Sequence, residues 1–587
     1  MQPKFRQRQL SPVVLRKAEA SGYTPLQARI IAGRLRDDEA DGLQSRISPR
    51  LSALNGPRNL PDIDLASERL VKAVVDQEVL ACATDFDADG VSAQTVIQTS
   101  FLDIFGHPRS KFRPFIGLRL RDGYGVSDNL VERILKESPD TNIVLTADQG
   151  SSDETRIAAL KQHGIQVVVT DHHTIPDAGP PASAYACVNP VRKDSAFEDQ
   201  YIAGVHVAFL TMCSVREKLI KAGILASSTP SLAHLADLVS LGTVADAVSF
   251  ARSINNRAIT MHGLSLMNSR NPRPCWAALR KLLKKSDAFV ASDIGFSAGP
   301  LVNAAGRLSD AMKGVKFLMS RTTEEAMEHL LDLDAANRDR RDIEARMRAM
   351  AMPIAEKQIA AGRKGLVVFM EQGHPGVHGV TCSRVTEAFG RPTGCFSPKV
   401  DNPDVLTGSF RSIEGVNVRD CLAEVHEHHP DIQLGWGGHS GAAGSHLMRK
   451  NLERFIDAFD QAVQTRTSGM TLMPTVTVDG ELPGPPGLEY LPEINALAPY
   501  GRQFDMPVFT LRATVSTIKA VGDGSHLQIG IKDGAGQQHA AIWFRAIGAD
   551  GVCPVEVGQQ GLFAYELGSN TFRDRTTAQL KIVACQS

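Results

Sequence analysis

Short apolar runs alternate with stretches of helical spacing from about residue 66 to 250. The runs "EVLACAT" (78–84), "TNIVLTA" (141–147) and "IQVVVT" (165–170) are short and continuously apolar, which is typical of strands buried on both faces. Between the last two, "SSDETRIAALKQHG" (151–164) has apolar residues at helical spacing and ends in a glycine. This strand–helix–strand pattern predicts an α/β domain with a mostly parallel sheet.

The rest of the chain predicts three further parts. Residues 321–362 are highly charged and contain few breakers, which indicates a long connecting helix. A second α/β pattern follows, then a Pro/Gly-rich boundary at 471–487, then short strands and turns that predict a small β-barrel. The expected division is a basic N-terminal lead-in (1–65), a first α/β domain (66–320), a connecting helix (321–362), a second α/β domain (363–468) and a barrel (472–587).

Length and composition are those of a multidomain globular protein. A chain of 587 residues is too long for one hydrophobic core, and 43% hydrophobic with 22% charged residues is ordinary. We see no secretory signal and no apolar run of membrane-spanning length, and the 9 cysteines include no CxxC pair. We therefore expect a cytoplasmic protein that has no membrane association.

Charge does not mark the whole chain as a nucleic-acid binder, because the net charge is −1. The segment 107–121 differs, since it has five basic residues, no acid, and Phe112 and Phe115 between them. Basic residues with interleaved aromatics suit a single strand of nucleic acid. A solvated basic loop explains the segment equally well, so both interpretations stay open.

Acidic residues follow the predicted strands. Asp85, Asp87 and Asp89 come directly after the first strand, Asp148 follows the second, and Asp171 begins "DHH" after the third. In a parallel sheet these positions share the carboxyl edge, where ligands bind.

This set of side chains has the composition of a divalent-metal site. Asp87, Asp89, Asp148, His172 and one further Asp suffice for two ions that share a carboxylate and support phosphoryl transfer. Taken alone, "DFDADG" is as consistent with a calcium-type or polar turn, and a lone "DHH" is more typical of a solvent-facing or core-satisfied histidine pair. Their occurrence after strands of one sheet favours the metal site.

The motifs resemble those of the DHH phosphoesterases and, within them, the RecJ-type single-strand exonucleases. The resemblance follows the chain in order and rests on "DFDADG", "TADQGSS", "VTDHH", "LADLVSLGTVADAV", "GPLVNAAGRLSDA", "HPGVHGVTCSR", "GSFRSI", "GWGGHSGAAGSH" and "LAPYGRQFDMPVF". It implies a DHH domain, a linker helix, a DHHA1 domain and an oligonucleotide-binding (OB) barrel.

The resemblance also implies the roles of individual residues at the metal site. Two ions, Mn²⁺ or Mg²⁺, are expected, so that no protein nucleophile is needed. Asp85 and Asp87 hold the first ion, Asp148 bridges, and the second is held by Asp89, His172 and Asp246. His173 lies beside the scissile phosphate. We expect Asp171 to orient the imidazoles, because a metal-bound histidine commonly needs a carboxylate or carbonyl on its other nitrogen, and we interpret Asp237 as a structural acid on a helix.

A second group of residues is expected to bind phosphate across a cleft from this edge. Glycines allow the backbone to approach a phosphate closely, and arginine grips it with two parallel hydrogen bonds. A glycine-rich turn is by itself more often only a turn, so these roles rest on the resemblance. The residues are Asn303, Arg307, Ser409, Arg411, Gly437 and Gly438, with His439 as a donor.

Four positions depart from the usual family pattern: Gln149, His206, His378 and Phe410. The two extra imidazoles and the aromatic ring, placed near the cleft, could alter metal preference or base stacking. They could equally be neutral replacements. None of the four removes an expected metal ligand.

The resemblance implies a metal-dependent 5′→3′ exonuclease that degrades single-stranded DNA to mononucleotides in recombination and repair. Two alternatives stay open: a DHH phosphodiesterase acting on short oligonucleotides or cyclic dinucleotides, and a non-catalytic replication scaffold. We expect a monomer whose partners are single-stranded DNA and, as candidates, a single-strand-binding protein and a helicase.

Overall fold

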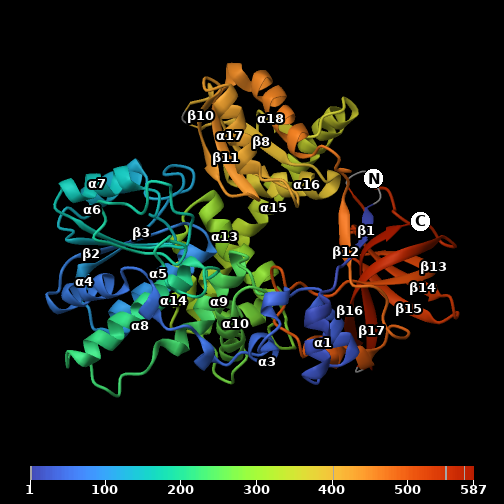
Figure 1. The fold of residues 1–587 in the computed structure, drawn as a ribbon, viewed down its shortest axis with the longest axis horizontal. Coiled ribbons are helices and arrows are strands. Elements are labelled where there is room, and N and C mark those ends of the chain that lie inside the picture. Colours follow the sequence, from blue (N-terminus) through green and yellow to red (C-terminus); the bar gives the residue numbers. More distant parts are fainter. Residues whose placement is uncertain (1–2, 401, 549–550, 574, 587) are drawn as a thin grey trace. The chain divides into compact units, whose positions relative to one another are not determined.

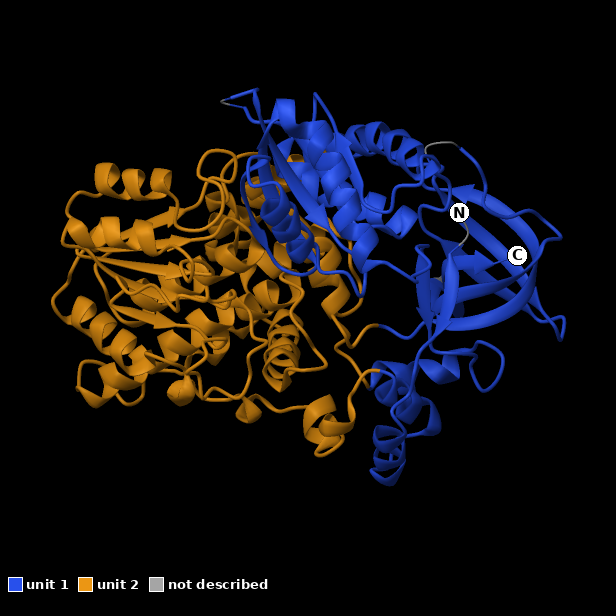
Figure 2. Cartoon of the chain, turned by 45° about the horizontal axis from the view of Figure 1, so that its top comes forward, with its two compact units in different colours: residues 1–33, 339–496, 506–587 blue, residues 34–338, 497–505 orange. Residues whose placement is uncertain are grey.

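A computed structural model describes residues 3–400, 402–548, 551–573 and 575–586. The chain forms two compact units (Figure 2). Unit 1 comprises residues 1–33, 339–496 and 506–587, and unit 2 comprises residues 34–338 and 497–505. The segment 1–65 is therefore divided, its first half belonging to unit 1 and its second half to unit 2.

Unit 2 contains a five-stranded sheet in the order β3-β2-β4-β5-β6, in which every neighbouring pair is parallel. All three apolar runs that predict strands form strands. The strands are β2 (Leu80–Thr84), β3 (Phe112–Ile116), β4 (Ile143–Ala147), β5 (Gln166–Thr170) and β6 (Ala186–Val188).

Helices cover both faces of this sheet, which explains why its strands are continuously apolar. Figure 1 shows α6 (Asp128–Glu137) and α7 (Glu154–Gln162) on one side of the sheet. Alternate side chains such as Ala83 and Val144 pack with these helices. Their neighbours along the strands, such as Cys82 and Leu145, belong to the larger core on the opposite face. That core includes α4 (Ile63–Val75), α5 (Ala88–Thr99), α8 (Gly204–Lys221) and α9 (Ala236–Ala245).

The remainder of unit 2 is helical. A long helix, α15, then runs from unit 2 into unit 1, where the charged segment predicts one. The elements are α3 (Leu43–Ile47), α10 (Ile254–Met267), α11 (Pro274–Leu282), α12 (Ala291–Asp293), the π-helix η7 (Ile294–Ala298), α13 (Gly299–Leu308), α14 (Met312–Met319) and α15 (Thr323–Ala360).

The segment 107–121 is not a stacking platform. Phe112 and Phe115 lie on β3 and are buried in the cores on the two sides of the sheet. Their rings cannot stack on nucleobases, so that interpretation of the interleaved aromatics is wrong. The two phenylalanines recur in this segment because β3 packs against a hydrophobic core on each of its two faces.

Unit 1 contains a mixed sheet in the order β10-β11-β9-β8-β7, in which only β7 and β8 pair in parallel. A cluster of four phenylalanines, Phe396, Phe410, Phe455 and Phe459, forms its core. The elements are β7 (Leu366–Phe369), α16 (His378–Phe389), β8 (Thr393–Pro398), β9 (Val405–Arg411), α17 (Val418–His428), β10 (Gln433–Gly438), β11 (Ala442–Met448) and α18 (Leu452–Arg466).

Two of these rings lie over glycines on the paired strand. Gly394 pairs with Phe410 and Gly408 with Phe396, and a Cβ atom on Gly394 would come within 2.3 Å of the Phe410 ring. We expect Gly394→Ala to lower the free energy of unfolding of unit 1 by about 1–3 kcal/mol, because the ring must leave its place in a packed core. Urea unfolding measures this, with Gly435→Ala as the control, since a Cβ there meets no atom within 4 Å. Equal midpoints for the two variants would contradict the prediction.

The C-terminal residues close into a barrel in the order β13-β14-β15-β17-β16. The N-terminal segment belongs to the same unit, because β1 pairs with β12 in parallel and Arg8 forms an ion pair with Asp479. The elements are β1 (Lys4–Gln7), α1 (Pro12–Ala20), α2 (Pro25–Ala32), β12 (Thr475–Val478), α19 (Leu491–Asn495), β13 (Phe509–Val521), β14 (His526–Asp533), β15 (Gln538–Trp543), β16 (Gln560–Phe572) and β17 (Arg575–Gln586).

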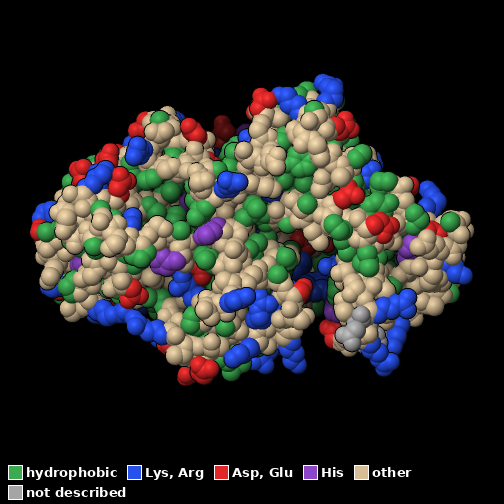
Figure 3. All heavy atoms as spheres, turned by 90° about the horizontal axis from the view of Figure 1, so that it is seen from below, with side chains coloured by type: hydrophobic (Ala, Val, Ile, Leu, Met, Phe, Trp, Pro, Cys, Tyr) green, Lys and Arg blue, Asp and Glu red, His purple; other side chains and the backbone are tan. Residues whose placement is uncertain are grey.

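The surface carries no single dominant charge. On the face drawn in Figure 3, basic and acidic side chains are interspersed, as the net charge of −1 suggests. Among the described residues, no helix combines the length and the apolarity needed to cross a bilayer.

Candidate metal centre

The first group of acidic residues lies where β2 ends and α5 begins. Asp87 is the N-cap of α5, and its Oδ1 accepts hydrogen bonds from the backbone N–H groups of Asp89 (2.8 Å) and Gly90 (3.1 Å). The N–H of Ala88 donates to Asn303 Oδ1 on α13 at 2.7 Å. The unpaired N–H groups of a helix N-terminus favour carboxylates, so this turn holds several close together.

Asp89 points to the N-terminus of a second helix. Its Oδ2 accepts from the N–H of Gly204 (2.7 Å) and its Oδ1 from the N–H of Val205 (3.0 Å), at the start of α8. Gly242 of α9 lies against the same carboxylate, since a Cβ there would be 2.4 Å from Asp89 Oδ1. Two helices therefore fix the position of this one side chain.

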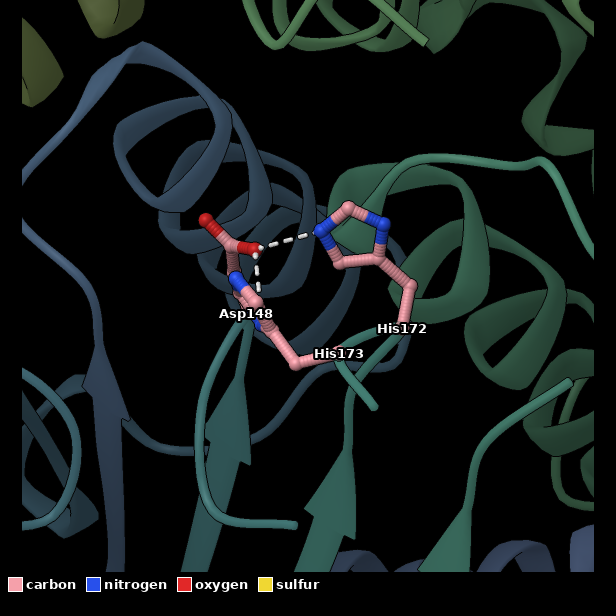
Figure 4. Close-up of side chains that lie close together, drawn as sticks. All are labelled: Asp148, His172 and His173. Carbon is pink, nitrogen blue, oxygen red and sulfur yellow. Dashed lines mark ion pairs between the residues drawn. The ribbon is translucent and has the colours of Figure 1, made fainter. Parts of the chain in front are cut away.

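Asp148 follows β4 in a left-handed conformation (φ 60°), which aspartate tolerates better than most residues. Its Oδ1 lies 3.2 Å from His172 Nε2 and 3.9 Å from His173 Nδ1 (Figure 4). His172 Nε2 is also 3.9 Å from Asp89 Oδ2 and 3.7 Å from Asp246 Oδ2, at the end of α9. The structure thus brings together acidic residues from three separate segments and the histidine pair from a fourth.

The side chains form three overlapping groups whose ligand atoms lie within 4.8 Å of one another. Carboxylate oxygens with an added imidazole are a suitable donor set for Mn²⁺ or Mg²⁺. Asp85 Oδ1 is buried without a hydrogen-bond donor from the described residues, as expected for a ligand that requires a cation. The groups are Asp85, Asp87 and Asp148; Asp89, His172 and Asp246; and Asp148, His172 and His173.

Without cations these carboxylates disfavour their own ionisation. Burial, followed by the charge of Asp87, raises the pKa of Asp85 to about 7 and that of Asp246 to about 7. Burial also raises the pKa of Asp89 well above its usual value, with a contribution from Asp246, and it raises that of Asp148, with a contribution from Asp89. A divalent cation would relieve both causes, because it compensates the lost hydration and the mutual repulsion.

A pH dependence of stability follows from these shifts. A carboxyl group whose pKa is about 4 unfolded and about 7 folded stabilises the fold below pH 4, and this contribution is lost as the pH rises to 7. In EDTA we expect the free energy of unfolding of unit 2 to fall between pH 4 and 7, by about 1.4 kcal/mol per pH unit for each proton released.

Saturating Mn²⁺ should remove most of this slope, because bound carboxylates are already ionised. Urea unfolding at a series of pH values, with EDTA or with Mn²⁺, measures the difference. Identical slopes in the two conditions would contradict the prediction.

Asp171 orients the second histidine instead of joining a metal group. Its Oδ1 accepts from the N–H of His172 and lies 2.7 Å from His173 Nδ1, and its Oδ2 accepts from the N–H of Ser151. Burial alone would raise the pKa of Asp171, but the positive charge and hydrogen bond of His173 lower it below its usual value. Although burial opposes it, the same contact raises the pKa of His173 to about 10, which favours the protonated imidazole.

The sequence alone did not single out Arg119. Its guanidinium carbon lies 5.1 Å from the ring centroids of Phe86 and Tyr124, and these two rings are 5.1 Å apart. Phe86 stands between Asp85 and Asp87, so this cation and the exposed ring of Tyr124 lie beside the metal groups. The available signal was its place at the end of the basic segment, two residues before the "RDGYG" turn.

In unit 1, the predicted phosphate-binding residues lie on β9 and on the β10–β11 hairpin. Ser409 and Arg411 share one face of β9, and Ser409 pairs with Gly444 of β11. The Arg411 guanidinium lies over Gly379, where a Cβ would be 2.7 Å from its Nη2. Gly438 has φ 130°, and the N–H of His439 donates to the Ala442 carbonyl in the hairpin turn.

Three family models match the chain: the DHH family N-terminal domain over residues 80–243, the DHHA1 domain over 362–465 and the RecJ OB domain over 484–584. A protein described as single-stranded-DNA-specific exonuclease RecJ, from Haemophilus influenzae, is 33% identical over 91% of this chain and 92% of its own length. The chain belongs to the RecJ family. The RecJ of Dickeya dadantii is 35% identical over 89% of this chain and 90% of its own length.

A solved RecJ structure has the same fold. The structure of RecJ from Thermus thermophilus in complex with Mn²⁺ superposes with a TM-score of 0.76, at 23% identity, over 100% of this chain and 79% of that chain. The α/β fold with a DHH domain, a DHHA1 domain and a closed five-stranded OB barrel is therefore confirmed.

The positions that depart from the usual RecJ pattern are all buried. Phe410 is fully buried in the phenylalanine cluster, because it alternates on β9 with Ser409 and Arg411, so its ring cannot stack on a base. His206 and His378 are also buried, and burial lowers the pKa of His206 to about 3. Among the described residues, neither belongs to a metal group. Gln149 donates to the Ala83 carbonyl and so ties the ends of two strands.

Asp237 has the structural role that the sequence indicates. It is buried on α9 and accepts hydrogen bonds from Trp276 Nε1 (2.7 Å) and Arg273 Nε (2.9 Å). These two donors stabilise the negative charge of the Asp237 carboxylate, so this residue does not require a metal ion.

Proposed function

We propose that this chain is a metal-dependent exonuclease that degrades single-stranded DNA from the 5′ end to 5′-mononucleotides, in recombination and repair. The observation that carries the proposal is the set of three overlapping Asp/His groups at the carboxyl edge of the sheet in a RecJ-family chain. The curated relatives are described as single-stranded-DNA-specific exonucleases, which supports the substrate.

We assign the metal ligands by the geometry of the groups. Asp85 and Asp87 would hold one ion and Asp89, His172 and Asp246 the other, with Asp148 shared between them. Two divalent cations, Mn²⁺ or Mg²⁺, supply activation of water and neutralisation of phosphate charge when bound. The Mn²⁺ in the Thermus relative supports the choice of metal.

The chain's own cations would bind the substrate phosphates. His173, held protonated by Asp171, would donate a hydrogen bond to the scissile phosphate, and its charge would stabilise the negative charge that develops there. Arg119 would hold the phosphate next to it. In unit 2, Arg307 would bind the 5′-terminal phosphate. The Oδ1 of Asn303 accepts a hydrogen bond from the backbone N–H of Ala88. A hydrogen bond from Asn303 to phosphate would therefore be donated by its Nδ2.

Unit 1 would contribute further contacts to the DNA backbone. Ser409 and Arg411 are on one strand face, and arginine grips a terminal phosphate with two hydrogen bonds. Gly437 offers an open backbone, since a Cβ there would meet no atom within 4 Å, and Gly438 with His439 shapes the hairpin turn. These residues are the proposed contribution of the DHHA1 domain to DNA binding. We propose domain limits of 66–320 for the DHH domain, 321–362 for the connecting helix, 363–468 for the DHHA1 domain and 472–587 for the barrel.

The two alternatives are less well supported. DHH phosphodiesterases that act on short oligonucleotides are generally shorter and lack the terminal barrel, and this chain matches the RecJ OB domain. A scaffold without activity would have lost metal-site acids, and Asp85, Asp87, Asp89, Asp148 and Asp246 are all present.

A labelled oligonucleotide tests the proposal. One single-stranded DNA is labelled at the 5′ end in one sample and at the 3′ end in another, and is incubated with Mn²⁺, Mg²⁺ or EDTA. We expect prompt release of a 5′-labelled mononucleotide, progressive shortening of the 3′-labelled strand, and no reaction in EDTA. Hydrolysis of dinucleotides with long strands intact would favour the small-substrate alternative, and binding without cleavage would favour the scaffold.

The cellular setting is also a proposal. All nine cysteines lie in the described part of the chain and none forms a disulfide, which supports a reducing cytoplasm. We propose that the protein acts as a monomer, on DNA that a helicase and a single-strand-binding protein present to it.

A further inference from the structure

A phenylalanine outside the metal groups is unusually exposed. Phe296, in the π-helix η7, has 81% of its surface exposed, the largest fraction among the large hydrophobic residues that the structure describes. Because the phenyl ring of Phe296 is not buried, it contributes little to the stability of the fold. A single π-helical turn within a helix is frequent at functional sites. Neither observation alone identifies a ligand. The position of Phe296 in the fold supplies the further argument.

Phe296 belongs to a solvent-accessible stripe along the continuous helix formed by α12, η7 and α13. Exposed Phe296 and half-buried Pro300, Asn303 and Arg307 recur at helical spacing on this side, while the residues between them are largely buried. At 1.5 Å per residue, Phe296 lies about 16 Å along the helix from Arg307. The stripe thus joins an aromatic ring at one end to a proposed phosphate-binding cation at the other.

This helix is held against both sides of the metal groups. At its start, Gly295 and Gly299 lie close to Val244 and Ala245, the two residues before Asp246. At its end, Asn303 Oδ1 accepts from Ala88, and Gly306 leaves no room for a Cβ beside the Phe86 carbonyl. The position of Phe296 relative to the metal groups is therefore fixed by packing within unit 2.

We propose that Phe296 is a base-stacking residue for the DNA strand whose 5′ phosphate is bound by Arg307. The proposal rests on the proposed function and adds to it a second contact on the strand. Stacked nucleotides rise about 3.4 Å each, so 16 Å places the stacked base within the first five nucleotides from the 5′ end. Stacking on an aromatic side chain tolerates any base and suits an enzyme without sequence preference.

Abasic substitutions in the DNA test the proposal one nucleotide at a time. Oligonucleotides carry one abasic site at each of the first few positions from the 5′ end, and release of the 5′-terminal nucleotide is followed in Mn²⁺. In the wild-type chain, we expect one position within the first five to raise KM about tenfold while kcat is unchanged. Phe296→Ala should raise KM about tenfold on the intact strand and be insensitive to the abasic site at that position. Phe296→Trp should restore the sensitivity.

Tyr185→Ala is the matched control. Tyr185 is a partly exposed aromatic of the same unit that precedes β6, at the amino end of the sheet and away from the metal groups. We expect it to keep the wild-type KM and the abasic sensitivity. Thermal unfolding of all variants should agree within a few degrees, because an exposed ring contributes little to stability.

The outcomes separate this proposal from the proposed function. Metal-dependent 5′ release with equal KM for intact and abasic strands would overturn stacking by Phe296 and leave the exonuclease intact. An abasic effect that persists unchanged in Phe296→Ala would likewise overturn it. Absence of any metal-dependent 5′ release by the wild-type chain would overturn the proposed function, and the present proposal with it.

Discussion

Asp148→Asn lowers the rate of nucleotide release by about 1,000-fold, if Asp148 is the carboxylate shared by the two metal ions. A Lewis-acid metal contributes several kcal/mol to such a reaction, and each 1.4 kcal/mol is a factor of about ten. Asparagine keeps the shape of the side chain and tolerates the left-handed conformation at φ 60°, so the turn after β4 should persist. Single-turnover release of the 5′-labelled nucleotide in Mn²⁺ measures the effect.

Metal binding and folding provide the controls for this variant. Titration with Mn²⁺ should show weaker binding than in the wild-type chain. The urea midpoint in EDTA should not fall, because the substitution removes a buried carboxyl group whose ionisation its surroundings oppose. Asp237→Asn is the matched substitution, since Asp237 is buried but bonded to Trp276 and Arg273. It should lower stability and leave Mn²⁺ affinity unchanged. Asp148→Asn activity within tenfold of wild type would exclude the shared-ligand role.

Gly204→Ala lowers the rate of nucleotide release by about 100-fold through a residue that binds no metal. A Cβ at this position would lie 2.6 Å from Asp148 Oδ1 and 2.9 Å from its Cα, so that either Asp148 or the start of α8 must move. The N–H of Gly204 also holds Asp89, so the displacement reaches two proposed ligands. A misplacement of about 1 Å costs about 100-fold in rate, and overpacking costs about 1–3 kcal/mol in stability.

Gly56→Ala is the control for this variant, because Gly56 lies in the same unit with φ −69° and a Cβ there meets no atom within 4 Å. Steady-state kinetics and Mn²⁺ titration of the two variants measure the difference. We expect Gly204→Ala to lose Mn²⁺ affinity as well as rate. Full activity with wild-type Mn²⁺ affinity would show that α8 can shift without disturbing the ligands.

Much of the candidate site could be predicted from local sequence pattern. Asp85, Asp87, Asp148 and His172 come directly after apolar runs, and the ends of parallel strands meet at one edge. The same kind of reasoning, carried further, would have placed Phe410 correctly. Residues of a strand alternate between faces, so Ser409 and Arg411 on one face require Phe410 on the other.

Other features depend on contacts between distant segments, which no local pattern contains. The segment 107–121 has the composition of a nucleic-acid-binding loop, yet Phe112 and Phe115 are buried because helices cover both faces of β3. Asp246 ends a helix more than 70 residues after His172, and spacing alone could not assign it to the site. Its place there rests on the family resemblance and on the packing of α9.

The sequence by itself determined the α/β class, the order of the domains and the acids at the strand ends, because these follow from periodicity and from motifs that are short in sequence. Only the tertiary structure decided which glycines make room for the ligands, how Asn303 holds the turn of Ala88, and that Phe296 stays exposed beside the site. The physical reason is that close packing and hydrogen bonding join residues that are far apart in the chain. Their distances are fixed by the whole fold and not by any single element.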